Sequence, residues 1–280
     1  MRAHGGAAAR HLAATALAVA AIAVLLRALA ALQASVAGVY CEAGGACAPP
    51  ARHALIVTAH PDDECMFFGP TIAALLQHNI SVSALCLSMG NADGLGDTRV
   101  RELTESYGVL GVPAEKVSWW DDAQLQDGMS TPWDPAHIGV RLRRYLAAAD
   151  VDLIVTFDAS GVSWHGNHIA THHGVLAPPA GKQAVCHTTP TSAPRLLLLR
   201  TLSPPTKFTG RLWSLVQWRR RGRPSEVTVL APYATYRRTV DAMHAHKTQL
   251  VWFRYVYLAL STYMHANVLE QVADGRHGGV

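Results

Sequence analysis

The segment ALIVTAHPDDE, residues 54–64, decides the fold class of this 280-residue chain. It opens with a compact, mostly apolar run of strand length and passes directly into the polar residues HPDDE at 60–64. A short buried strand that ends in a polar turn is typical of α/β folds, where ligands bind beyond the carboxyl ends of parallel strands. We therefore expect the chemistry of this protein to begin at His60.

Strand and helix patterns alternate after this segment. We expect helices over residues 65–78, 98–110 and 135–149, and strands over residues 82–87, 117–120 and 152–157. This alternation predicts an α/β fold with a doubly wound, mostly parallel, Rossmann-like sheet. The polar loops that follow the first, second and fourth strands then emerge at one edge of the sheet.

The first 40 residues predict a transmembrane helix. Residues 12–40 are mostly Ala, Val, Leu and Ile with Arg27 as the one charge, and this length suffices to cross roughly 30 Å of hydrocarbon. A cleaved secretory signal is the alternative, because two arginines precede an apolar core and small residues follow it. The expected organisation is an anchor at 1–40, a linker at 41–53, a catalytic domain at 54–270 and a tail at 271–280.

Composition excludes two classes of protein. The net charge is only +4 and charged residues make up 16% of the chain, without the clustered basic and aromatic residues that a nucleic-acid binder needs. The five cysteines are odd in number and lack CxxC spacing, so they predict neither a disulfide framework nor a thiolate zinc site.

A metal centre is the first candidate site. His60 and Asp63 lie three residues apart across the turn, and His168 belongs to a second strand-end loop, HGNH at residues 165–168. Two imidazoles and one carboxylate leave an open position for water, as in catalytic zinc sites. Iron oxygenases use the same ligand types, so the metal stays open. Ordinary turn and helix-cap chemistry is the competing explanation for the paired aspartates.

Catalytic roles follow from the same loops. Asp62 abuts Asp63, and because successive side chains in a turn cannot both reach a metal, we expect Asp62 to act on a water as general base. His165 is expected to stabilise an oxyanion or protonate the departing amine. The glycine-rich loop 90–96 leads into a helix bearing Arg99. This arrangement predicts an anion site, with a flexible connection as the alternative.

Five segments resemble the family of N-acetylglucosaminyl-phosphatidylinositol de-N-acetylases, called PIG-L, to which bacterial LmbE-like sugar deacetylases also belong. They are AHPDDE at 59–64, SMGNADGLGDTRVREL at 88–103, VLGVP at 109–113, TFDASGVSWHGNHIA at 156–170 and QLVWFRYVYLALSTYM at 249–264. The first alone indicates the superfamily. The five in this order span most of residues 54–264 and indicate the phosphatidylinositol branch.

The resemblance implies a zinc enzyme that removes acetyl from N-acetylglucosaminyl-phosphatidylinositol, the second step of GPI-anchor synthesis at the endoplasmic reticulum. It implies zinc ligands at His60, Asp63 and His168, with Asp62 as general base and His165 as the electrophilic histidine. Two alternatives remain open: a related hydrolase of a soluble N-acetylglucosamine conjugate, and a catalytically idle membrane partner that keeps the fold.

Several positions need separate expectations. Arg99 matches a family arginine near the substrate, which favours a phosphate contact. Trp164 stands where the family has a small residue and predicts a narrower pocket or a reshaped loop. Residues 175–193 contain three prolines and read as less helical than the family. Glu64 is either structural or orients a ligand histidine.

The resemblance also implies a single-pass membrane protein with its catalytic domain on the cytoplasmic face. The positive-inside rule weakly favours the opposite face, because Arg2 and Arg10 precede the predicted span. Five arginines form a basic cluster that suits an anionic leaflet: Arg211, Arg219, Arg220, Arg221 and Arg223. Residues 250–264 are short for a span and predict a buried or interfacial helix.

Overall fold

The computed structural model describes residues 51–128, 131–177, 194–213 and 225–272. Within them lies a seven-stranded sheet with strand order β3-β2-β1-β4-β5-β7-β6. The strands are β1 His53–Thr58, β2 Ser81–Cys86, β3 Val117–Trp119, β4 Leu153–Phe157, β5 Arg195–Leu199, β6 Glu226–Leu230 and β7 Ala266–Gln271. The first five are parallel, and β7 runs against both of its neighbours. The predicted mostly parallel sheet is confirmed.

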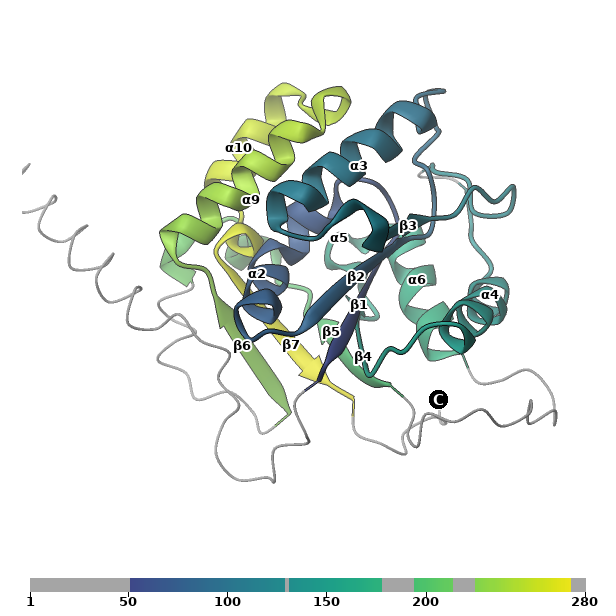
Figure 1. Cartoon of the computed structure of the whole chain (residues 1–280). Helices are drawn as coiled ribbons and strands as arrows, with labels where there is room; N and C mark the ends of the chain where they lie inside the picture. The colour runs from purple at the N-terminus through teal and green to yellow at the C-terminus, as the bar shows by residue number, and fades with distance from the viewer. Residues whose placement is uncertain (1–50, 129–130, 178–193, 214–224, 273–280) are drawn as a thin grey trace, which may run out of the picture. The chain divides into compact units, whose positions relative to one another are not determined.

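Helices cover both faces of this sheet (Figure 1). The longer ones are α2 Gly69–Gln77, α3 Gly96–Leu110, α4 Pro135–Ala147, α6 Gly166–Leu176, α9 Tyr233–Ala245 and α10 Trp252–Leu260. Short turns are η1 Glu64–Phe68, η2 Ala114–Lys116, α5 Gly161–Trp164, α7 Pro204–Lys207, η3 Lys247–Gln249 and η4 Thr262–Met264. Helices α2, α3 and α9 pack together on one face, and α4 packs on α6 on the other.

Strand β1 lies inside the sheet, and its residues are buried on both faces. Leu55, Ile56 and Val57 are all fully buried, between β2 on one side and β4 on the other. A continuous apolar run, rather than an alternating one, is what a strand covered by helices on both faces requires. The parallel register brings the loops after β1, β2 and β4 to one edge of the sheet.

Strand β7 is hydrogen-bonded to the helical segment η1–α2. Asn267 of β7 is fully buried, and its side-chain amide donates to the carbonyl oxygen of Phe67 at 2.9 Å. Its carbonyl oxygen accepts from the hydroxyl of Thr71 at 2.6 Å. Buried polar side chains are stable when their donors and acceptors are paired in this way. The C-terminal strand therefore holds the helical segment that leaves the HPDDE turn.

The predicted elements up to residue 157 are confirmed, with ends shifted by a few residues. One difference is local: the helix predicted from residue 65 begins as the π-helical turn η1 before α2 takes over at Gly69. Such turns often occur at functional sites. The predicted anchor, the arginines at 219–223 and residues 178–193 lie outside the described residues. Among the helices that are described, none has the length and apolar character to cross a membrane.

Candidate active site

Three side chains with metal-binding donors converge at the edge of the sheet where β1 and β4 end. Donor atoms of His60, Asp63 and His168 all lie within 4.8 Å of one another, and all three residues are buried. His60 and Asp63 belong to the turn after β1, whereas His168 lies in the first turn of α6. The structure therefore brings together the three residues that the sequence suggested as ligands.

Asp63 is held as a carboxylate, with one oxygen bonded to the backbone and the other facing His168. Its Oδ2 accepts hydrogen bonds from the backbone amides of Ala59 at 3.0 Å and His60 at 2.8 Å. Burial by itself would raise the pKa of Asp63, but His168 and His60 hold that pKa below its ordinary value. The remaining oxygen, Oδ1, lies 3.2 Å from Nε2 of His168.

A backbone hydrogen bond determines which ring nitrogen His168 presents to the site. Nδ1 of His168 lies 3.0 Å from the carbonyl oxygen of Gly161, which can only accept, so this nitrogen carries the proton. Burial by itself would lower the pKa of His168, but Asp63 raises that pKa above its ordinary value. The 3.2 Å contact between Nε2 of His168 and Oδ1 of Asp63 therefore holds a proton that a bound cation would replace. Burial lowers the pKa of His60 to about 4, so its imidazole is neutral at physiological pH. Metal binding requires both imidazoles to be neutral, so an ion bound here would displace the Nε2 proton of His168.

Asp62 occupies a strained position beside the ligands. Its φ is +108°, in the region that non-glycine residues rarely adopt, and its Oδ2 accepts from Nη2 of Arg254 at 2.7 Å. Burial raises the pKa of the Asp62 carboxyl, Asp63 acts in the same direction, and Arg254 opposes them. A carboxyl whose pKa lies above its ordinary value is closer to the value that suits a general base near neutral pH.

His165 caps α6 and faces the other two histidines. Its Nδ1 accepts from the backbone amide of Asn167 at 3.2 Å, which leaves Nε2 as the protonated nitrogen of the neutral ring. Its ring centroid lies 4.9 Å from that of His60 and 5.0 Å from that of His168. Burial and His168 together lower its pKa, so the neutral N–H form prevails. This form can donate to a developing negative charge.

A cavity of about 420 Å³ opens on all of these groups. Its lining includes every predicted site residue: His60, Asp62, Asp63, Arg99, His165 and His168. Helix α10 closes another side with Phe253, Arg254 and Tyr257. A space of this size is typical of small-molecule sites, and it holds the candidate metal ligands, the candidate base and a neutral histidine donor.

Arg99 ties three loops together at the cavity wall. Its Nη1 donates to the carbonyl oxygen of Gly90 at 2.8 Å and to Asp127 at 2.9 Å, and its Nη2 donates to the carbonyl oxygen of Pro61 at 2.8 Å. Gly90 has φ +68°, and an added Cβ there would lie 2.5 Å from the guanidinium carbon of Arg99. Much of the guanidinium is therefore engaged by the protein, and a contact with substrate is left to its remaining N–H groups.

Glu64 supports Asp62 rather than a ligand histidine. Its Oε1 accepts from Nε2 of His246 at 2.6 Å and from the hydroxyl of Ser106 at 2.5 Å, and its Oε2 accepts from the backbone amide of Asp62 at 3.1 Å. Glu64 and His246 are both fully buried. Of the two roles open from sequence, the structural one is observed.

Three residues near the site were not predicted from sequence: Asp127, His246 and Arg254. Asp127 lies 3.2 Å from Nε2 of His60, a carboxylate–histidine contact of the kind that orients metal ligands. It follows β3 in a polar loop, the same signal that identified the other loops. Arg254 was visible as a lone charge in an apolar segment. The position of His246 in the sequence gives no indication that it lies near the site.

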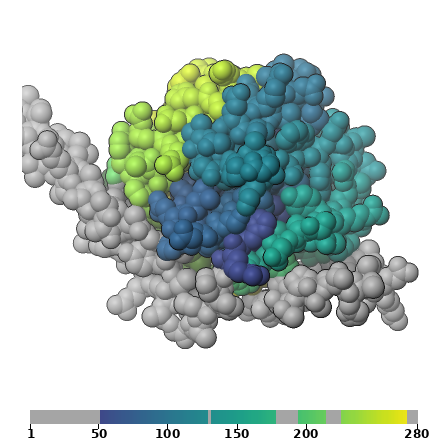
Figure 2. Space-filling view, in the orientation of Figure 1, coloured from purple at the N-terminus to yellow at the C-terminus, as the bar shows by residue number. Residues whose placement is uncertain are grey.

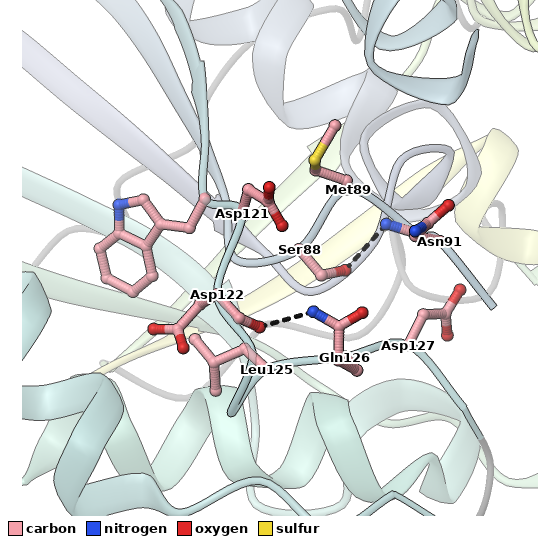
Figure 3. A pocket seen from close by; sticks show the side chains of 10 residues that line it. Ser88, Met89, Asn91, Asp121, Asp122, Leu125, Gln126 and Asp127 are labelled. Carbon is pink, nitrogen blue, oxygen red and sulfur yellow. Dashed lines mark hydrogen bonds between the residues drawn. The ribbon is translucent and has the colours of Figure 1, made fainter. Parts of the chain in front are cut away.

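The loops after β2 and β3 enclose a second, smaller pocket beside the site (Figure 3). Ser88 lines it and donates to the carbonyl oxygen of Ala59, directly before the HPDDE turn, at 2.8 Å. Gln126 lies across from Ser88 and donates to the backbone of Asp122 at 2.7 Å. Asp127 closes one end of this pocket. The residues around this pocket thus help to position Asp127 next to His60.

Trp164 does not narrow the cavity. Its side chain is 54% exposed, and it is absent from the residues that line the cavity. Val162 and Trp164 both have positive φ, at +51° and +58°. The narrower pocket expected from Trp164 is therefore not observed, and the reshaped loop stays a prediction.

Comparison with known proteins gives sequence relatives over most of the chain. The family profile described as "PIG-L: GlcNAc-PI de-N-acetylase" matches residues 55–178. The chain is 38% identical to a probable N-acetylglucosaminyl-phosphatidylinositol de-N-acetylase of Schizosaccharomyces pombe, covering 78% of this chain and 86% of that one. It is 33% identical to the enzyme of that name from Bos taurus, covering 77% and 82%.

Solved structures share the fold at low identity. An N,N'-diacetylchitobiose deacetylase from Pyrococcus horikoshii superimposes with a TM-score of 0.56 at 18% identity, covering 79% of this chain and 84% of that one. A 4-carboxy-2-hydroxymuconate hydratase from Pseudomonas putida reaches 0.53 at 14% identity, covering 82% and 99%. Since a deacetylase and a hydratase share this fold, the fold alone does not determine the reaction.

Proposed function

This chain belongs to the PIG-L family of GlcNAc-PI de-N-acetylases, and from that premise we propose that it hydrolyses the acetamide of N-acetylglucosaminyl-phosphatidylinositol. The products are acetate and glucosaminyl-phosphatidylinositol, which corresponds to the deacetylation step of GPI-anchor biosynthesis. One observation carries the proposal. A chain this similar to such deacetylases also joins His60, Asp63, His168 and the carboxylate of Asp62 in a single cavity.

His60, Asp63 and His168 are proposed to hold Zn²⁺ or another divalent cation. Two imidazoles and an ionised carboxylate fit such an ion, and the hydrogen bond from Nδ1 of His168 to Gly161 fixes which nitrogen is offered. When bound, a divalent cation lowers the pKa of a water and polarises a carbonyl. Elemental analysis of the purified protein will distinguish zinc from other divalent metals.

Asp62 is proposed to move the proton, and His165 is proposed to stabilise the oxyanion. As the water oxygen bonds to the acetyl carbon, Asp62 takes the proton that the water releases. The Nε2–H of His165 donates to the carbonyl oxygen on which negative charge develops. The bond between the acetyl carbon and the sugar nitrogen then breaks, and the proton held by Asp62 passes to that nitrogen. Asp62 is thereby restored as a carboxylate.

The membrane assignment is also a proposal. We propose that residues 1–40 anchor the chain once in the endoplasmic reticulum membrane, with residues 54–270 on the cytoplasmic face. The apolar composition of residues 12–40 supports the anchor. An enzyme anchored in the same bilayer as its lipid-linked substrate meets that substrate at a high local concentration.

The purified full-length chain in phospholipid–detergent micelles provides the test. Acetate release from N-acetylglucosaminyl-phosphatidylinositol should be abolished by a chelator and restored by Zn²⁺. Free N-acetylglucosamine in the same micelles is the control substrate and should react much more slowly. Preferred turnover of the soluble sugar would move the assignment to a soluble conjugate. No turnover of either substrate by the metal-loaded chain would favour an idle membrane partner.

A further inference from the structure

Helix α10 exposes an apolar face to solvent. The exposed positions 252, 255, 256, 259 and 260 recur at the spacing of one helical face, and they carry only apolar or aromatic side chains: Trp252, Tyr255, Val256, Ala259 and Leu260. Trp252 is 78% exposed. The inward face consists of Arg254, Tyr257 and Leu258. An amphipathic surface helix normally turns its polar residues to solvent, so α10 departs from that arrangement.

The apolar face continues beyond the helix. Phe208 and Leu212 follow α7, and both are exposed, with Leu212 at 69%. Gly210 lies between them, and an added Cβ on it would lie 3.4 Å from the carbonyl oxygen of Leu260. The two segments therefore meet at the C-terminal end of α10. In Figure 2, yellow atoms of the C-terminal part lie at the upper left of the described region.

The same helix forms a wall of the catalytic cavity. Phe253, Arg254 and Tyr257 line the cavity, and Arg254 donates to the candidate base Asp62 at 2.7 Å. The hydroxyl of Tyr257 donates to the carbonyl oxygen of Met66 at 2.9 Å. The exposed face and the cavity wall are thus two sides of one nine-residue helix that is fixed to the HPDDE turn.

We propose that α10 docks in the interfacial layer of a phospholipid bilayer and so places the mouth of the cavity at the level of lipid headgroups. The inference rests on the proposed function, because a lipid-linked sugar is the substrate that such a placement serves. Docking keeps the acyl chains in the bilayer while the acetamide reaches His60 and Asp62. The helix lies along the surface, since nine residues are too few to span.

Side-chain chemistry favours a lipid surface over a protein partner or a second copy of the chain. Tryptophan and tyrosine are the residues enriched where protein meets lipid headgroups. No carboxylate occurs between Asp241 and Glu270, so nothing along this stretch repels an anionic leaflet. Lys247, which precedes the helix, is exposed. An apolar face next to a basic residue fits the interface of a bilayer with anionic lipids.

Two substrates separate docking from catalysis. The W252S/V256S variant of the full-length chain should lose about tenfold in kcat/KM towards the lipid substrate in vesicles of phosphatidylcholine and phosphatidylinositol. Its kcat/KM towards the water-soluble N-acetylglucosaminyl-inositol phosphate, which lacks acyl chains, should equal that of the wild type. The matched control W119S removes a tryptophan that is 39% exposed on β3 and should change neither value. Equal loss on both substrates, or no loss on the lipid, would overturn the proposal.

A fluorescent label reads docking without turnover. Cys41, Cys47 and Cys186 are replaced by serine, Cys65 and Cys86 are buried, and a single cysteine is placed at position 252 or 119 of the full-length chain. Brominated phospholipids should quench a fluorophore at 252 and leave one at 119 bright. Equal quenching at both positions, or none at 252, would overturn docking even if the lipid is hydrolysed. Failure of the wild type on both substrates would instead refute the proposed function while the quenching result stands.

Discussion

The HPDDE turn separates two clusters of buried side chains that both resemble metal sites. On one side are His60, Asp63 and His168, and on the other are Glu64, Cys65 and His246, each set with donor atoms within 4.8 Å of one another. The first set lines the 420 Å³ cavity, whereas no member of the second lines it. The difference teaches that proximity of ligand-type residues does not by itself define a metal site.

Internal pairing distinguishes the two clusters. Glu64 bonds directly to His246 at 2.6 Å, so the strongest donor and acceptor of the second cluster already satisfy each other. Burial and the neighbouring Glu64 raise the pKa of Cys65 well above its ordinary value, which keeps it a neutral thiol rather than the thiolate that binds metal. In the first cluster, hydrogen bonds to the backbone fix the donors, and the facing pair, Oδ1 of Asp63 and Nε2 of His168, is more widely spaced at 3.2 Å.

Substitutions in the first cluster should have the largest effects. His168→Ala is expected to abolish both metal binding and acetate release, because it removes one of three ligands. Asp62→Ala should retain the metal and lose about two to four orders of magnitude in rate, the usual contribution of a positioned base. Metal analysis and kcat on the same preparations check both. Full deacetylation by either variant would refute these roles.

A substitution in the second cluster should affect stability first. Glu64→Ala leaves His246 buried without its partner, which costs about 3–5 kcal/mol in the free energy of unfolding. Glu105→Ala, which removes an exposed carboxylate from α3, is the matched control and should cost little. Urea denaturation of both variants provides the comparison. If both variants lost the same small amount of unfolding free energy, the buried pair would contribute no more to stability than a surface carboxylate does.

The second cluster should also make stability depend on pH. Burial by itself would lower the pKa of His246, but Glu64 raises it above its ordinary value. This contribution to stability is therefore complete below the unfolded-state pKa of about 6.5 and is lost as pH rises through the raised folded-state pKa. The stability difference between wild type and His246→Asn should shrink between pH 6 and pH 9. A difference that grows over this range would contradict the charged pair.

The first cluster was predictable from the sequence and the second was not, for a physical reason. His60 and Asp63 follow an apolar strand, and His168 follows another, so parallel topology alone brings them to one edge. His246 and Arg254 reach Glu64 and Asp62 across 182 and 192 residues of chain. Those contacts depend on how α9 and α10 pack, which no local spacing encodes. The positive φ of Asp62 likewise results from tertiary packing rather than from its own preference.

The smallest effect is expected at Cys65. Cys65→Ser preserves the hydrogen bond to the carbonyl oxygen of Asp62 and should leave the metal content unchanged, with a stability cost of about 1 kcal/mol. Metal stoichiometry and thermal unfolding of this variant measure both quantities. A marked loss of metal would mean that the thiol side of the turn is the binding site.

X-ray absorption at the metal edge of the zinc-loaded full-length chain tests the central claim most directly, because it identifies the atoms bound to the ion. The account predicts nitrogen and oxygen neighbours only, from His60, Asp63 and His168, in the wild type and in Asp62→Ala alike. A sulfur neighbour at about 2.3 Å would place the ion with Glu64, Cys65 and His246 and contradict the assignment of the site.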